Sequence, residues 1–262
     1  MKIPEILASG AFETDSCRFA IPAEWMQGRT SYGGLSSALA LETARRLHPG
    51  LPPLRSAAVS FIGPLAGEVT VTARQLRKGR NATWIAAEVA SEAGVGLTAS
   101  FVFMGPVESA LHLNDAPPPA GWIAPEDALP LPPRTGPGFI GNFEVRFGLP
   151  RAEKPLPELC WWVRLRDRAN ETGEGLDPMV ELMAIADVLP PGVMPLLRAG
   201  PVSSMTWLVN LLTPAPVTRD GWWLVRAAGN YAEKGCSSQD MGVWNAVGEP
   251  VAMGMQSIAL FG

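Results

Sequence analysis

Histidine is scarce in this chain, and its two histidines, His48 and His112, limit the catalytic chemistry that the sequence can support. A serine or cysteine nucleophile needs a base within hydrogen-bonding reach. His48 precedes Pro49 at the end of an expected helix, and His112 lies beside a proline-rich segment. The G-x-S-x-G nucleophile elbow is also absent. These absences argue against a Ser-His-Asp hydrolase.

Motifs for cofactors and metal ions are missing as well. No G-x-G-x-x-G run opens a βαβ unit, no P-loop pattern occurs, and no spacing of histidine and acidic residues is typical of a metal site. Cys17, Cys160 and Cys236 are scattered, which suits neither a disulfide framework nor a zinc site with its short ligand spacing. We therefore expect no cofactor and no metal ion, and we interpret the cysteines as small packing residues.

The chain has neither a basic cluster nor a long apolar run. Its formal net charge is −4 and no block of Lys or Arg stands out, so the electrostatic footprint of a nucleic-acid-binding protein is missing. No run of about 18 apolar residues occurs, which predicts no transmembrane span. The first residues include Glu5 and Glu13 and do not resemble a signal peptide. We expect a soluble, cytoplasmic protein that folds without a nucleic-acid partner.

Proline is concentrated between residues 105 and 138, where its missing N–H group disfavours regular structure. We interpret this run as a connector. The predicted organisation is an N-terminal unit over residues 1–108, a proline-rich linker over 109–138, and a C-terminal unit over 139–262.

The same order of elements occurs on both sides of the connector. A helix is expected from Gly33, followed by strands from Arg55 and Glu68 and a hairpin over residues 82–105. After the connector come strands at 143–148 and 160–167, a helix from Asp177, and strands beginning at 202, 221, 237 and 251. The chain is therefore predicted to be an α+β protein in which each half wraps one apolar helix in an antiparallel sheet. An overlay that places Gly94 on Gly248 aligns the last strands of the halves.

Several segments resemble the acyl-CoA thioesterase II family, which has a double hotdog fold. In the first half, Tyr32, Gly33 and Gly34 open the helix as in that family. In the second half, FEVRF, CWWVRLR, IADVLP and VAMGMQSIAL resemble its strands and the end of its helix. The match covers nearly the whole chain. The dehydratases and hydratases that share this fold need a His together with an Asp, and the scarcity of histidine argues against them.

The resemblance implies hydrolysis of a fatty or related acyl-CoA to a free acid and CoA by an activated water molecule. It places the catalytic residues at Asp187, Ser204 and Gln256, with Ser203 and Thr206 as alternatives for the hydroxyl. The pantetheine arm is expected between the halves, and the acyl chain in a tunnel whose walls include residues such as Trp207, Leu208 and Leu211. A core position for Trp207 is the alternative, because aromatic side chains dominate cores as well as pockets. In this strand the segment TWLVNLL departs from the family pattern, so the substrate tunnel is expected to differ.

Helix and strand periodicity support the assignment of Asp187 and Gln256 independently of the family resemblance. Asp187 follows Met183 by four residues, at the edge of an apolar helix stripe, where a carboxylate needs polar partners. Gln256 lies on the apolar face of a strand by period-two counting, and the overlay places Val102 at the equivalent point of the first half. The alternatives are that Asp187 lies at a surface-exposed helix end, and that Gln256 lies on an edge strand or at an oligomer contact.

Two further predictions concern the glycine pair and the assembly. Gly33 and Gly34 could offer backbone N–H groups to an oxyanion, or could simply allow a tight entry into the helix. The partner is predicted to be acyl-CoA, and a homo-oligomer is expected because a hotdog sheet leaves an edge and a face to cover. The rival function is a non-catalytic acyl-CoA or acyl-chain binding protein on the same scaffold.

Overall fold

The computed structural model describes residues 1–132, 136–168, 175–198 and 200–261, in which twelve strands form one antiparallel sheet. The first half contains α1 (Ile3–Ala8), β1 (Ala11–Phe12), β2 (Ser16–Ala20), β3 (Met26–Gln27), β4 (Thr30–Ser31), α2 (Gly33–Leu47), β5 (Leu54–Phe61), β6 (Glu68–Lys78), β7 (Ala82–Ser91) and β8 (Gly94–Met104). The second contains β9 (Phe143–Phe147), β10 (Glu158–Leu165), α3 (Pro178–Ala186), β11 (Val202–Leu211), β12 (Trp223–Glu233), β13 (Cys236–Trp244) and β14 (Pro250–Leu260). Short 3₁₀ turns lie at Ala23–Trp25, Gly138–Asn142 and Met194–Leu196, and β3 pairs with β4 outside the main sheet.

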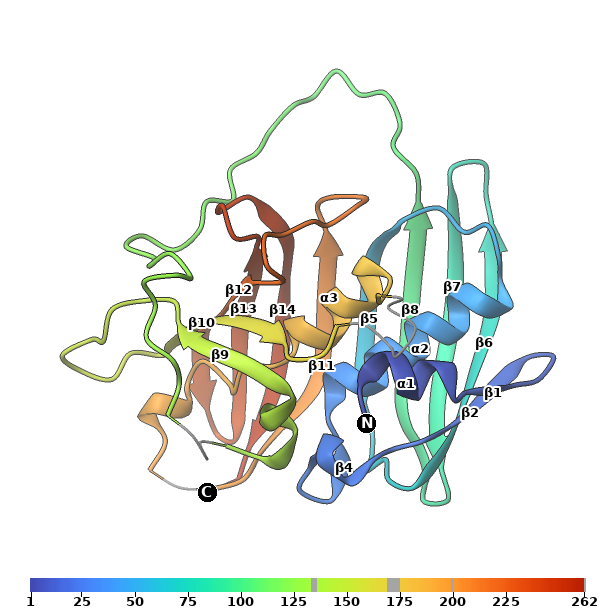
Figure 1. Ribbon diagram of the computed structural model, residues 1–262, viewed down its shortest axis with the longest axis horizontal. Helices are drawn as coiled ribbons and strands as arrows, with labels where there is room; N and C mark the ends of the chain where they lie inside the picture. The colour runs from blue at the N-terminus through green and yellow to red at the C-terminus, as the bar shows by residue number, and fades with distance from the viewer. Residues whose placement is uncertain (133–135, 169–174, 199, 262) are drawn as a thin grey trace.

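The strand order shows the duplication directly. It runs β1-β2-β6-β7-β8-β5 through the first half and β11-β14-β13-β12-β10-β9 through the second, so each half repeats the other in reverse. The halves join where β5 pairs with β11, and they lie side by side in Figure 1. The predicted α+β double hotdog, with one main helix and one antiparallel sheet in each half, is confirmed.

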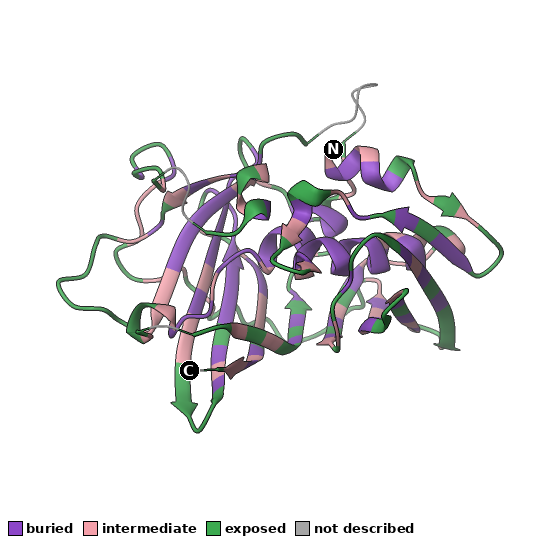
Figure 2. Cartoon of the chain, turned by 90° about the horizontal axis from the view of Figure 1, so that it is seen from below, coloured by how far each residue is buried: buried purple, intermediate pink, exposed green. Residues whose placement is uncertain are grey.

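The core lies between the sheet and the helices. Residues of α2 and α3 form one apolar cluster with the inward faces of both halves, and Figure 2 shows the buried residues on the helices and on the strand segments that face them. Every residue of α3 from Met179 to Ala186 is buried, so burial extends around the whole helix and is not confined to the expected apolar stripe. No helix in the described parts of the chain is long and apolar enough to cross a membrane.

The two main helices begin differently. Asp177 caps α3, because its carboxylate accepts hydrogen bonds from the N–H groups of Met179 at 2.9 Å and Val180 at 3.4 Å, and it also pairs with Arg45 of α2 at 2.6 Å. The N-cap of α2 is Tyr32, whose side chain makes no capping bond. Instead the Tyr32 hydroxyl donates to the carbonyl of Ala184 at 2.7 Å, which holds the start of α2 beside the end of α3.

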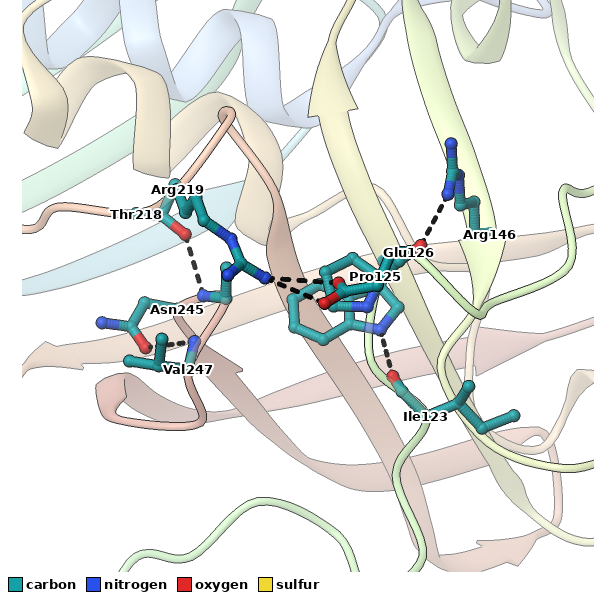
Figure 3. A network of polar contacts seen from close by, with 10 residues as sticks. Ile123, Pro125, Glu126, Arg146, Thr218, Arg219, Asn245 and Val247 are labelled. Atoms are coloured by element: carbon teal, nitrogen blue, oxygen red, sulfur yellow. Dashed lines mark hydrogen bonds and ion pairs between the residues drawn. The ribbon is translucent and has the colours of Figure 1, made fainter.

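The proline-rich connector follows the outside of the second half. Its described residues contain no strand or helix up to the turn at Gly138, apart from one isolated bridge between Pro130 and Arg146. Figure 1 shows it arching above the sheet after β8. Farther along, the indole of Trp162 donates to the carbonyl of Ile123 at 2.7 Å, and Arg219 pairs with Glu126 at 3.2 Å (Figure 3). The connector thus covers tryptophans on the outer face of the sheet.

One detail of the predicted overlay is wrong. Val102 is only partly buried and lies on the outer face of β8, whereas its neighbours Phe101 and Phe103 are fully buried. Gln256 lies on the inner face of β14. Because neighbouring strand residues point to opposite faces, a shift of one residue exchanges inside for outside. The inward positions of β8 that correspond to Gln256 are therefore occupied by phenylalanine.

Candidate active site

Asp187 is the C-cap residue of α3, and its side chain meets the start of α2. A Cβ atom built on Gly33 would lie 2.5 Å from Oδ2 of Asp187 and 2.8 Å from the ring of Phe61, so the carboxylate occupies space that only glycine leaves open. The first N–H groups of a helix have no acceptor within the helix and carry partial positive charge. A residue of the second half thus meets a helix start of the first half.

Gln256 is the direct hydrogen-bond partner of Asp187. Its Nε2 donates to Oδ1 of Asp187 at 2.9 Å, and its side chain is buried with 4% exposed. The Oε1 atom of Gln256 accepts a hydrogen bond from Nε2 of Gln239 at 2.9 Å. The predicted pairing of a helix carboxylate with a strand amide is therefore present, and the surface alternatives for both residues do not describe this structure.

The environment favours the protonated form of Asp187. Burial raises the pKa of this carboxyl from its ordinary value of 3.8 to about 7, and the hydrogen bond from Gln256 opposes that shift. Burial also holds the pKa of the Tyr32 phenol well above its ordinary range, with a smaller contribution from the nearby Asp187 charge. Asp187 can consequently exchange a proton near neutral pH.

A pocket of about 590 Å³ opens onto this carboxylate. Both halves contribute to its wall, which includes Gly33 and Ser36 of α2, Asp187, and Ser203 and Ser204 of β11. The apolar part of the wall includes four prolines together with Phe61, Ile62, Leu65, Leu97, Phe139, Ile140, Trp161, Val188, Leu189, Met194 and Val202. The pocket is large enough to enclose part of an organic ligand.

A β-bulge in β11 separates the candidate hydroxyls. The register with β14 shifts between Ser204 and Thr206, so that Ser204 lies opposite Ile258 and Thr206 opposite Ser257. Ile258 is fully buried, which places Ser204 on the inner face, whereas Thr206 is exposed. Ser203 also lines the pocket but is exposed. Among the three hydroxyls, Ser204 combines an inner-face position with contact to the pocket.

Other predicted residues lie away from the pocket. Trp207 is 1% exposed and lies opposite Gln256 in the core, while Leu208 is on the outer face and 38% exposed. Leu211 is buried, and none of these three lines the pocket. The predicted tunnel wall at these positions is therefore wrong: the bulge and the strand alternation direct them into the core or to the outside.

The second glycine of the pair has a packing role. A Cβ atom on Gly34 would lie 2.5 Å from the Tyr32 hydroxyl and 2.7 Å from the carbonyl oxygen of Ala184. Gly34 therefore allows α2 and α3 to approach closely, which is the tight-entry alternative, and it does not line the pocket. Gly33, in contrast, is part of the wall.

Sequence reasoning missed Gln239. It is completely buried on β13 and connects Gln256 to the backbone N–H of Gly192, which donates to Oε1 of Gln239 at 2.7 Å. The signal was available, since Ser237, Gln239, Met241 and Val243 alternate inward by the same period-two counting that singled out Gln256. Among the described residues, no group of three or more His, Cys, Asp or Glu could hold a metal ion.

Comparisons with known protein families identify both halves of the chain. The family model described as acyl-CoA thioesterase N-terminal domain matches residues 21–104, and that described as acyl-CoA thioesterase C-terminal domain matches residues 114–260. No curated protein matches the chain.

Solved structures share the fold over nearly the full chain. A conserved protein of unknown function with a hot dog fold from Alicyclobacillus acidocaldarius has a TM-score of 0.83 at 19% identity. The alignment covers 100% of this chain and 99% of that protein's chain. A putative thioesterase II from Thermobifida fusca YX has a TM-score of 0.82 at 20% identity, with 99% and 98% covered. The tesB protein of Mycobacterium avium subs paratuberculosis has a TM-score of 0.79 at 16% identity, with 98% of each chain covered. The two matched family domains follow one another and together span most of the present chain. This chain therefore belongs to the acyl-CoA thioesterase family.

Proposed function

We propose that this protein hydrolyses acyl-CoA thioesters and that Asp187 is the general base that activates water. One observation carries the proposal: a carboxylate on the wall of a pocket has a pKa raised to about 7 and accepts a hydrogen bond from a buried amide behind it. A general base is most effective when its pKa lies near the working pH. Asp187 therefore suits proton transfer at neutral pH.

In the proposed reaction, ionised Asp187 accepts a proton from water while the water oxygen attacks the thioester carbonyl carbon. Negative charge develops on the former carbonyl oxygen, and the N–H groups at the start of α2, beginning at Gly33, support that charge. When the carbon–sulfur bond breaks, the CoA sulfur leaves as a thiolate and takes the proton from Asp187. The products are a free acid and CoA, and the carboxylate is regenerated.

Gln256 and Ser204 support the base and the water in this proposal. Gln256 does not line the pocket, and the N–H that its amide donates to Asp187 orients the carboxylate that holds the water. The Ser204 hydroxyl lies on the pocket wall and can both donate and accept. A general base of this kind contributes on the order of a hundred- to ten-thousand-fold to the rate, and oxyanion stabilisation must supply the remainder.

The composition of the pocket supports an acyl-CoA substrate. Its wall is mainly apolar, as an acyl chain requires, and it also includes Gln27 and Arg29 next to the turn between β3 and β4. Both residues are exposed, and Arg29 is the only basic side chain among the described lining residues. The polar and anionic part of CoA fits at this edge, with the acyl chain directed inward.

The proposal is tested by following thiol release from a panel of acyl-CoA substrates of increasing chain length. We expect turnover of at least one substrate by the wild-type protein. Tight binding of acyl-CoA in calorimetry, without release of CoA from any substrate, would instead support the non-catalytic binding protein. The homo-oligomer and the cytoplasmic location remain predictions, and size-exclusion chromatography with light scattering tests the first.

A further inference from the structure

A second buried amide stands behind Gln256. Gln239 lies directly opposite Gln256 in the register of β13 and β14. The N–H of Gly192 donates to Oε1 of Gln239 at 2.7 Å, Nε2 of Gln239 donates to Oε1 of Gln256 at 2.9 Å, and Nε2 of Gln256 donates to Asp187 at 2.9 Å. Three consecutive hydrogen bonds thus connect a backbone group to the proposed base.

The donor-to-acceptor direction of this series of hydrogen bonds is determined by its first donor, the backbone N–H of Gly192. A backbone N–H can only donate, so the atom of Gln239 that faces Gly192 must be its carbonyl oxygen. The other end of the Gln239 amide is then a donor, and Gln256 must present its own carbonyl oxygen to it. The NH₂ group of Gln256 consequently faces Asp187, which must accept. An isolated glutamine could turn its amide over; here each reversal would place two donors or two acceptors together.

Gly192, where the series of hydrogen bonds begins, is tightly packed. A Cβ atom on Gly192 would lie 2.7 Å from the backbone nitrogen of Gly229 and 2.8 Å from the carbonyl oxygen of Ala227, so the Gly192 peptide rests directly on β12. Gly192 and Asp187 also belong to the same segment after α3. Both ends of the hydrogen-bond chain are therefore attached to one loop, and the two glutamines fasten that loop to the sheet.

We infer that Gln239 is a positioning residue that fixes which end of the Gln256 amide faces Asp187, and thereby holds Asp187 as a hydrogen-bond acceptor. The inference rests on the proposed function for its kinetic readout, whereas the hydrogen-bond chain itself is independent of turnover. Gln239 does not line the pocket, and it acts through Gln256.

Few other charged groups lie close enough to Asp187 to affect its protonation. Arg29 is the only other ionisable side chain among the described lining residues, and Tyr32, which packs nearby, stays neutral because burial raises its pKa. On α3, Glu181 is bound to Arg168 at 3.0 Å. On β13, Asp240 is exposed on the outer face. These groups are unchanged by substitution at Gln239.

The test uses two variants of Gln239 in the full chain. Gln239→Glu keeps the shape but supplies the donor to Gln256 only while its own carboxyl is protonated, so we expect kcat/KM to fall at high pH where the wild-type protein stays at its maximum. The pH profile becomes bell-shaped.

Gln239→Met removes both hydrogen bonds with an unbranched side chain. We expect the midpoint of the acid limb of the kcat/KM profile to move upward by about one pH unit, because the fixed donor to the Asp187 carboxylate is lost.

Gln75→Glu makes the same chemical change at an exposed position of β6 and should leave the profile unchanged. If Gln239→Glu lowers kcat/KM by the same factor at every pH, or Gln239→Met destabilises the protein without moving the midpoint, Gln239 is merely structural and the inference fails. Carboxyl ¹³C NMR of Asp187 in the wild-type protein and in Gln239→Met gives the same midpoint without turnover. This measurement decides the inference even if no acyl-CoA is hydrolysed.

Discussion

Replacing Asp187 by asparagine should abolish turnover and, at the same time, stabilise the fold at alkaline pH. The variant keeps an oxygen that can accept the hydrogen bond from Gln256 and nearly the same volume, but it cannot take a proton from water. Loss of general-base action predicts a decrease in kcat of about a hundred- to ten-thousand-fold.

The change in stability follows from the raised pKa. In the unfolded chain the carboxyl ionises near 3.8, whereas in the folded protein it ionises near 7. The favourable contribution of the protonated carboxyl is complete below the unfolded value, and it is lost as the pH rises through about 7. Ionisation in the folded state then costs about 4 kcal/mol in total. Between pH 5 and pH 8 the wild-type protein should lose roughly 2 to 3 kcal/mol of unfolding free energy relative to Asp187→Asn.

Thiol release gives the first quantity, and urea denaturation at both pH values gives the second. Asp240→Asn is the matched control, because Asp240 is exposed on the outer face of β13 and should change neither. Full activity in Asp187→Asn would reject Asp187 as the base. An unchanged stability difference between the two pH values would show that the carboxyl is not shifted by burial.

Four further outcomes can be checked. In the wild-type protein, kcat/KM should rise with pH and level off above about pH 7, as initial rates across the pH range will show, because only ionised Asp187 accepts a proton. Ser204→Ala should lower kcat/KM about tenfold, whereas Thr206→Ala on the outer face should change it less than about twofold in the same assay. Gly34→Ala should destabilise the fold by about 1 to 3 kcal/mol in urea denaturation, since its Cβ would lie 2.7 Å from the Ala184 carbonyl oxygen. Arg29→Gln should raise KM for acyl-CoA about tenfold but leave KM for the matching N-acetylcysteamine thioester, which has no phosphate, unchanged.

The sequence predicts the elements of this fold well because their signals are local. The helix from Gly33 and the strands around it follow from apolar spacing, and Asp177 with Pro178 identifies the start of α3. Gln256 could be singled out because an amide is unusual on the inner face of a strand. Each of these features is visible within about ten residues of chain.

The remaining features depend on contacts between distant segments. The pairing of β5 with β11, which merges the halves into one sheet, has no local signal. The bulge at residue 205 decides which hydroxyl faces inward, and it also displaces Trp207 from the expected tunnel. The closeness of Asp187 to Gly33 depends on how two helices meet across the halves. The sequence could identify these residues as candidates, but it could not predict which of them come into contact.

The unequal helix starts have a consequence for the number of ligands. A duplicated fold offers two places where an anion could rest on a helix end. At α3 this place is taken by the protein's own Asp177, which is neutralised in turn by Arg45. At α2 the aromatic Tyr32 leaves the leading amides uncapped by a side chain, and the pocket opens there. Of the two equivalent helix starts in the described residues, only that of α2 opens onto the pocket, and a saturating titration should therefore end at one acyl-CoA per polypeptide.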